Sequence, residues 1–413
     1  MTERAKTERI LQKLAVAREE TGTSRTLFAA CPNSRAVIRA SIRAAKRNNA
    51  PIKFAATLNQ VDQDGGYTGM TQRQFVEVIR SEAARMHFTG PVIIAVDHGG
   101  PWLRDNQREE KWSLQETMDW VKKSFSDAID AGYDLLHVDP TVDIQLPPGK
   151  ILPISVVTDR TVELISHCER YREQAGRPPV SYEVGTEEVH GGLADLGVFR
   201  EFLRLLSTGL EKAGCKGVWP CFVVGKVGTD LHTTLFDPET ARKLVSIAGE
   251  YGSLIKGHYT DNVENPGDYP ATGMGAANVG PEFTEREYDA LMELDRLEAG
   301  LVSEGKLQAP SGTKEALWSA VIGSGRWTKW VQGDERADDF STISPERQLW
   351  LVKTGCRYIW EDRQVTAARE ALYRNLETAG IDAEGVVLAS IENAMDKYFS
   401  SFNLVNLNPL LEE

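Results

Sequence analysis

Short apolar runs alternate with longer amphipathic stretches over roughly the first 300 residues of the chain. The stretches place apolar residues three and four positions apart, which is the spacing of one face of an α-helix. Residues 114–131 and 197–213 are the clearest of these predicted helices, and residues 7–20 form another before the first apolar run. The pattern predicts repeated strand–helix units.

Eight of the apolar runs are predicted strands. They span residues 26–31, 52–59, 92–99, 135–140, 180–187, 219–226, 253–260 and 276–281. The first run is not followed by the G-x-G-x-x-G turn of dinucleotide-binding sheets, and eight strand–helix units favour closure into a ring. The sequence therefore predicts an α/β protein with a (β/α)8, or TIM, barrel. A doubly wound open sheet is the alternative.

The alternation ends near residue 301, and the rest of the chain is predicted to be helical. Helical segments cover residues 313–323, 345–355, 369–378 and 385–399, with polar turns between them. The tryptophans of this region are expected to pack against the barrel or a second subunit, since large aromatic side chains are usually buried. We expect a barrel domain over residues 1–300 and a helical extension over residues 301–413 that packs on it.

Composition argues against several classes of protein. The 413 residues are 41% hydrophobic and 26% charged, which is typical of a globular protein with a large core. The formal net charge of −13 and the lack of a basic, aromatic-rich stripe argue against nucleic-acid binding. No apolar run is long enough to cross a membrane, and the charged N-terminus does not resemble a signal peptide. The five cysteines are scattered and form no C-x-x-C pair, so we expect reduced thiols in a cytoplasmic protein.

Polar residues gather at the carboxyl ends of the predicted strands, where TIM barrels carry their active sites. The strand ends supply Asn59, Gln60, Asp97, His98, His137, Asp139, Glu183, Glu187, Asp230, His232, Lys256, His258, Asp261 and Asn278. Among them, His98, His232 and His258 come from three different strands. With Glu183 they are expected to form a ligand set for Zn²⁺ or Mn²⁺. A single histidine at a strand end is more often structural, so the prediction of a metal site rests on all four residues together. The side chain of His137 is expected to point either into the barrel interior or to the site.

The segment VIIAVDHGGP (residues 92–101) places Asp97 and His98 next to each other at the end of a strand. Neighbouring residues of a strand point to opposite faces, so both side chains can face the barrel mouth only where the chain bends. We expect Gly99 and Gly100 to supply this bend.

Candidate substrate contacts lie in loops at the same end of the barrel. The loop over residues 59–71 contains three glycines, which suit either a backbone that approaches a ligand or an ordinary turn before a helix capped by Thr71. Gly280 and Thr284 lie at the start of the helix after the last strand, a common phosphate position in barrels. The expected substrate contacts are Asn59, Gln60, Lys256, Asn278, Gly280 and Thr284.

Six segments add a family resemblance; they are, in chain order, NQVDQDGGYTGMT, DHGGP, HVD, YEVGTE, HYTDN and NVGPEFT. With them the chain resembles the accessory, or non-catalytic, subunits of class II tagatose-bisphosphate aldolase, which are often labelled tagatose 6-phosphate kinases. The resemblance spans nearly the whole chain, including RYIWEDRQV in the C-terminal region. Expected partners are an aldolase catalytic subunit or further copies of this chain.

More distantly, the chain resembles catalytic class II ketose-bisphosphate aldolases. This likeness implies His98, His232 and His258 as metal ligands. It also implies Glu183 at or beside the metal and Asp97 as the acid or base that transfers a proton. The glycine–serine phosphate loop of those aldolases is replaced here by YTDN after His258.

Some members of the accessory-subunit family resemble sugar or sugar-phosphate 4-epimerases. We therefore expect a metal-dependent ketose or ketose-phosphate 4-epimerase, of the tagatose 6-phosphate/fructose 6-phosphate type, that breaks and re-forms the C3–C4 bond by retro-aldol and aldol chemistry. Asp97 would transfer one proton, and Asp139, Glu187 or Asp261 would be the second acid or base. The alternatives are a non-catalytic stabilising subunit of the aldolase and an aldolase with net cleavage. A kinase is not expected, because the chain has no G-x-x-x-x-G-K-[ST] loop to hold a nucleotide.

Overall fold

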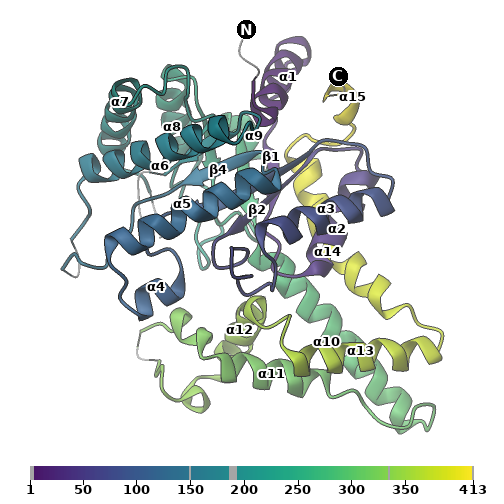
Figure 1. The fold of residues 1–413 in the computed structure, drawn as a ribbon. Coiled ribbons are helices and arrows are strands. Elements are labelled where there is room, and N and C mark those ends of the chain that lie inside the picture. Colours follow the sequence, from purple (N-terminus) through teal and green to yellow (C-terminus); the bar gives the residue numbers. More distant parts are fainter. Residues whose placement is uncertain (1–3, 148–149, 186–192, 334, 412–413) are drawn as a thin grey trace.

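The computed structural model describes residues 4–147, 150–185, 193–333 and 335–411. Its centre is a closed barrel of eight parallel strands in sequence order (Figure 1). The strands are β1 (Leu27–Ala30), β2 (Ile52–Thr57), β3 (Val92–Gly99), β4 (Leu135–Val138), β5 (Ser181–Val184), β6 (Phe222–Val224), β7 (Leu254–Gly257) and β8 (Ala276–Val279). Because β8 pairs with β1, the ring closes. The predicted TIM barrel is confirmed, and the open sheet is wrong.

Helices precede, separate and follow the strands of the barrel. They are α1 (Lys6–Thr21), α2 (Arg35–Arg47), α3 (Gln72–Arg85), α4 (Asp105–Glu109), α5 (Leu114–Ala131), α6 (Ile154–Gln174), α7 (Leu196–Lys212), α8 (Pro238–Glu250), α9 (Asp268–Thr272) and α10 (Pro281–Ser303). α5 has both of its predicted ends. Ser113 and Glu116 form a capping box at its start, and Gly132 ends it in the left-handed conformation, with φ of 86°.

Both faces of the barrel wall are buried, as is usual for parallel sheets covered by helices. On β1 the ring of Phe28 lies 5.5 Å from Tyr398 and 5.1 Å from Phe399. Those two rings belong to α14 (Ala383–Ser401), which packs against α2 and α10 (Figure 1). A C-terminal helix therefore completes the layer of helices around the barrel.

α1 packs at the amino end of the barrel. The Nζ of Lys6 lies 3.2 Å from the carboxylate of Asp134, and the Thr7 hydroxyl donates to the carbonyl oxygen of Asp134, just before β4. Asp134 also accepts the backbone N–H of Ile94 at 2.9 Å. These contacts tie α1 to the starts of β3 and β4, opposite the carboxyl ends of the strands.

The remaining C-terminal elements are α11 (Thr313–Ser324), α12 (Pro345–Gly355), α13 (Arg363–Thr378), α15 (Asn408–Leu411) and the 3₁₀ helices η1 (Arg326–Trp330), η2 (Phe340–Thr342) and η3 (Cys356–Tyr358). α11, α12 and α13 lie at the opposite end of the molecule from α1 and α15 (Figure 1). α13 begins earlier than the predicted residue 369, because Asp362 accepts the N–H groups of Gln364 and Val365 and caps the helix there. No helix within the described ranges has both the length and the apolar character of a membrane span.

A buried carboxyl group in this helical layer makes stability depend on pH. Glu287 of α10 is 1% exposed and accepts a 2.6 Å hydrogen bond from Ser34, the N-cap of α2. Burial raises the pKa of Glu287 to about 7. Between its unfolded value of 4.5 and about 7, the folded state holds a proton that the unfolded state has lost, so stability falls as pH rises through this window and is level above it.

We expect Glu287→Gln to remove this dependence, because the amide keeps an acceptor for Ser34 and carries no proton to lose. The variant should gain up to about 3 kcal/mol of unfolding free energy at pH 8 and less than about 1 kcal/mol at pH 5. Urea unfolding of both proteins at the two pH values measures the difference. An equal loss of stability at both values would contradict the assignment.

Candidate active site

The end of β3 is bent so that two consecutive side chains reach the barrel mouth. His98 has a left-handed backbone, with φ of 47°, and the pairing register between β3 and β4 shifts between Val96 and Gly99. The bend predicted at Gly99 and Gly100 is therefore at His98 itself, and that part of the prediction is wrong. A bulge of this kind re-aims side chains at strand ends.

The two glycines instead allow close packing. A Cβ on Gly99 would lie 2.4 Å from the ring of Phe125, and a Cβ on Gly100 would lie 1.9 Å from the carbonyl oxygen of Asp139. Glycine is needed at both positions because β4 and α5 approach the chain at this point.

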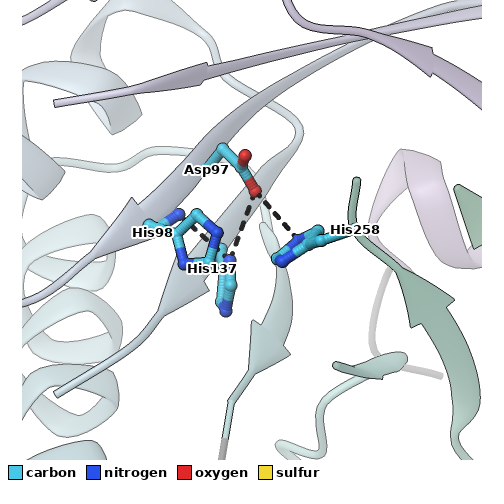
Figure 2. A group of neighbouring side chains, drawn as sticks. All are labelled: Asp97, His98, His137 and His258. Carbon is cyan, nitrogen blue, oxygen red and sulfur yellow. Dashed lines mark hydrogen bonds and ion pairs between the residues drawn. The ribbon is translucent and has the colours of Figure 1, made fainter. Parts of the chain in front are cut away.

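Asp97, His98, His137 and His258 form one compact group at the mouth (Figure 2). One possible ligand atom from each residue lies within 4.8 Å of all the others. The carboxylate of Asp97 is 3.4 Å from Nδ1 of His137 and 3.4 Å from Nε2 of His258. The ring centroids of His98 and His258 are 4.4 Å apart. Residues from β3, β4 and the end of β7 therefore converge on one point.

The donor set of this group fits a divalent metal ion. Nε2 of His258 is buried and makes no hydrogen bond within the described part of the chain, which leaves it open to a ligand, whereas His137 accepts the backbone N–H of His98 at its Nδ1 and orients that residue. Nδ1 of His98 lies 2.6 Å from a carboxylate oxygen of Asp139, which leaves Nε2 of that ring for a ligand role. A carboxylate behind a histidine is the usual arrangement around bound metals, because it fixes the orientation of the ring.

Four buried charges lie directly beneath the histidines. Nζ of Lys256 donates to Asp97 at 3.0 Å and to Glu183 at 2.5 Å, and Nζ of Lys53 lies 3.4 Å from Glu183. Burial alone would raise the pKa of Asp97, but the charges of Lys256, His98 and His258 outweigh it and hold that pKa well below its usual value. For the same reason Lys256 and Lys53 keep the pKa of Glu183 low. Both carboxylates are ionised at neutral pH.

The structure brings together His98 and His258 of the predicted ligands. Glu183 lies next to them, 3.2 Å from Nδ1 of His137, and is engaged by the two lysines. His232 is outside the group: it lines the cavity above the histidines, and its exposed ring packs at 5.0 Å on Trp350 with the ring planes tilted by 30°. Asp230 accepts the N–H of His232 and holds the loop after β6 in that position. His137 is the fourth member of the group in the structure.

The predicted proton-transfer and phosphate residues have structural partners. Asp139 lies against His98 and accepts the hydroxyl of Thr141 at 2.6 Å. Asp261 accepts the N–H groups of Gly280 and Glu282, each at 2.8 Å, and thus occupies the start of α10 where a phosphate was expected. Thr284 is fully buried and bonded to Asn33, while Glu187 lies outside the described residues.

A cavity of about 850 Å³ opens above the histidines. Asn59, Gln60, Asn278 and Gly280 are among its lining residues, whereas Lys256 lies beneath its floor. Nδ2 of Asn278 donates to the second oxygen of Asp97 at 3.0 Å, and its Oδ1 is buried without a hydrogen bond among the described residues. Among the predicted substrate contacts, Asn278 therefore has a hydrogen-bond acceptor available to a ligand next to Asp97.

The loop over residues 59–71 forms one wall of this cavity. Asp62, which is 0% exposed, accepts hydrogen bonds from Arg104, Trp120 and Ser124 at 2.6–2.8 Å. Thr71 caps α3, as one of the two interpretations of this loop expected, and it does so in a capping box with Gln74. The loop is anchored to α5, so it serves as a fixed wall.

The comparison with known proteins agrees with this geometry. A family model described as D-tagatose-1,6-bisphosphate aldolase subunit GatZ/KbaZ-like matches residues 11–397. The chain belongs to this family. The resemblance to the accessory-subunit family is thereby confirmed, and the protein is related to class II aldolases.

Solved structures share the fold. The GatZ/KbaZ-like chain is similar to a Sinorhizobium meliloti 1021 protein described as a probable tagatose 6 phosphate kinase, with 24% identity and a TM-score of 0.74, over 91% of this chain and 100% of that one. It is also similar to a fructose-bisphosphate aldolase from Campylobacter jejuni, with 11% identity and a TM-score of 0.53, over 96% of this chain and 94% of that one.

The reasoning from sequence left one feature of the site open and missed another. His137 had a signal, because it lies two positions before Asp139 on the same strand and alternate residues share a face. Lys329, Trp330 and Arg357 of the helical extension also line the cavity. No local pattern marked them, since only the tertiary fold brings η1 and η3 to the barrel mouth.

We expect His98→Ala and His258→Ala to abolish metal binding, because each removes one of the clustered nitrogen ligands. Asp139→Asn should weaken affinity about 10–100-fold through loss of the carboxylate behind His98. His232→Ala is the matched control and should retain its metal. Elemental analysis after dialysis against zinc or manganese measures the metal content of each variant. Loss of the metal from His232→Ala would instead support the ligand set predicted from sequence, which includes His232.

Proposed function

We propose that this GatZ/KbaZ-like protein is a metal-dependent ketose or ketose-phosphate 4-epimerase. The supporting observation is the group of three histidines and Asp97 at the floor of a sugar-sized cavity. Imidazole donors favour Zn²⁺, with Mn²⁺ as the second choice, and Asp97 stays free of the metal as the proton-transfer group. When bound, such an ion polarises the oxygens of a ketose and stabilises the charge that forms as the C3–C4 bond breaks.

The reaction proposed here conserves every atom. Removal of the proton from the C4 hydroxyl lets C4 become an aldehyde, while the electron pair of the C3–C4 bond passes to C3 and the C2 carbonyl as an enediolate. Rotation of the aldehyde presents its other face. The C3–C4 bond then forms again, the C4 oxygen regains a proton, and the product is the C4 epimer.

Asp97 is suited to accept the C4 proton. Lys256 holds one of its oxygens and Asn278 holds the other, so the carboxylate has a fixed orientation. Its low pKa keeps it ionised and therefore able to act as a base. His98 and His258 line the same cavity as this carboxylate, so a sugar bound there would meet the imidazoles and Asp97 together.

Asp261 is our proposed second acid or base. It lines the same cavity, and burial raises its pKa to about 7, although two backbone N–H groups partly offset the effect. A carboxyl group that is half protonated near neutral pH can return a proton to the substrate on the face away from Asp97. The charged or titratable groups that interact with Asp261 within the described residues include Glu282 and Glu285 of α10, Cys31 after β1, Tyr259 after β7, Tyr269 of α9 and Tyr398 of α14.

The purified, zinc-loaded protein should interconvert tagatose 6-phosphate and fructose 6-phosphate, with C4 configuration followed by NMR. Chelation should abolish turnover, and Asp97→Asn should lower kcat about 10²–10⁴-fold while leaving metal content unchanged. Stable production of two three-carbon fragments would indicate an aldolase with net cleavage. Absence of any ketose turnover by the metal-loaded protein would rule out the epimerase.

Asp261→Asn should change the pH profile. If the protonated carboxyl group is the acid, the rate of the unaltered protein falls as pH rises through about 7, the pKa of Asp261. The variant should be about 10²-fold slower below pH 7, and its rate should not show the fall through pH 7. Steady-state rates from pH 5.5 to 8.5 measure both effects, and the same fall in the variant would exclude Asp261.

A stabilising subunit of class II tagatose-1,6-bisphosphate aldolase is the second candidate, and the family description favours it. In that case the chain would copurify with a catalytic subunit and raise its activity, while its own ketose turnover would be absent. Substituting the clustered histidines would then leave the stimulation intact.

A further inference from the structure

Cationic side chains of the helical extension gather at the roof of the cavity. Lys329 and Arg357 line it, and Arg326 is adjacent, with its guanidinium 4.6 Å from the ring of Tyr358. Asp105 pairs with both Arg326 and Lys329, so one carboxylate is shared by two cations. Arg326, Lys329 and Arg357 thus outnumber Asp105 at this place, although Asp97, Glu109, Asp230 and Asp261 also line the cavity.

Arg357 has a geometry that suits an anion. Its Nε donates to the carbonyl oxygen of Thr354 at 2.8 Å, while its Nη2 is buried without a hydrogen-bond partner within the described ranges. No carboxylate of the described residues forms an ion pair with it. A buried donor on a charged group is unfavourable unless a ligand satisfies it.

Aromatic packing fixes this guanidinium in place. It lies 4.9 Å from the ring of Trp330 and 5.4 Å from the ring of Tyr358. Tyr358 in turn meets Tyr67 of the anchored loop edge-to-face at 5.2 Å. The orientation of Arg357 is therefore set before a ligand arrives, which reduces the entropy lost on binding.

Two other parts of the cavity are less suited to a negative group, while Arg108 of α4, whose Nε donates to the carbonyl oxygen of Trp102, is a further cation of the lining. Asp261 already occupies the amide groups at the start of α10. The floor holds the ionised carboxylate of Asp97 with its paired lysine, Lys256. An anion is thus favoured at the roof, away from the reacting carbons.

We propose that Arg357, assisted by Lys329, binds a terminal anionic group of the substrate, a phosphate monoester or a carboxylate. The substrate is then a charged sugar held with its carbonyl end at the histidines and its charged end against the extension. The choice of sugar end rests on the proposed function, whereas anion binding by Arg357 does not. Planar guanidinium donors match both oxyanions by paired hydrogen bonds.

Isothermal titration calorimetry of the metal-loaded protein with tagatose 6-phosphate, tagaturonate and free tagatose tests this proposal. The charged ligand that the site accepts should bind at least tenfold more tightly than tagatose. Arg357→Met, which keeps the stem between the aromatic rings, should weaken that ligand about 10–100-fold and leave tagatose unchanged. Preference for the phosphate or for the carboxylate identifies the anion.

Arg363→Gln is the matched control, because Arg363 is an exposed arginine nearby in the sequence at the start of α13, and it should bind as the unaltered protein does. Arg357→Lys and Lys329→Gln give independent variants should Arg357→Met fail to fold, and each should weaken only the charged ligand. Equal affinity for charged and free sugars, or equal weakening of both in the variants, would overturn the proposal. Selective binding of the charged sugar without any turnover would support anion binding by Arg357 and contradict the proposed epimerase activity.

Discussion

The balance of four buried charges inside the barrel is the constraint on which the rest of the site depends. Lys256 lies between Asp97 and Glu183, and Lys53 lies on the far side of Glu183. Each charge removed from water costs several kcal/mol unless it is paired, so each of these residues is tolerated only because of the others. Together they fix the position and the ionisation of Asp97, and they do so with residues from β2, β3, β5 and β7. The closed barrel is what brings those four strands to one point.

Strain at β3 serves the same arrangement. A left-handed residue other than glycine costs about 1–3 kcal/mol, and it persists only where its surroundings hold it. His98 is held on two sides, by Asp139 at Nδ1 and by His137, whose Nδ1 accepts the N–H of His98 at 3.0 Å. The close approach at Gly99 and Gly100 makes room for both partners. The strained backbone at His98 is therefore what lets Asp97 and His98 face the same cavity.

The sequence predicted those parts of the molecule that depend on local patterns. The eight strands follow from apolar runs, and the ends of α5 follow from a capping box and a glycine. Strand ends also identified Asp97, His98 and His258, because parallel strands in a barrel place all of their carboxyl ends at one mouth. His232 has the same residue type at a similar place, but its loop carries it to a part of the cavity lining beside Trp350, apart from the clustered histidines, and only the course of that loop separates it from them. Arg357 had no signal, since its role arises from contacts across more than 250 residues, from η3 back to Tyr67.

The cavity therefore has two ends of different origin. Strand residues build the floor, and their charges are so tightly coupled that a substitution at any one of them unbalances the rest. The roof comes from the helical extension, where Lys329 pairs with Asp105 of α4 and Arg357 packs on Trp330 and Tyr358, apart from that charge network. Changes in the extension can thus alter which group is recognised at the far end of a bound sugar without disturbing Asp97 or the histidines. TIM barrels commonly separate a conserved chemical floor from variable recognition at the mouth, and in this chain a segment that follows the barrel in sequence supplies the recognition.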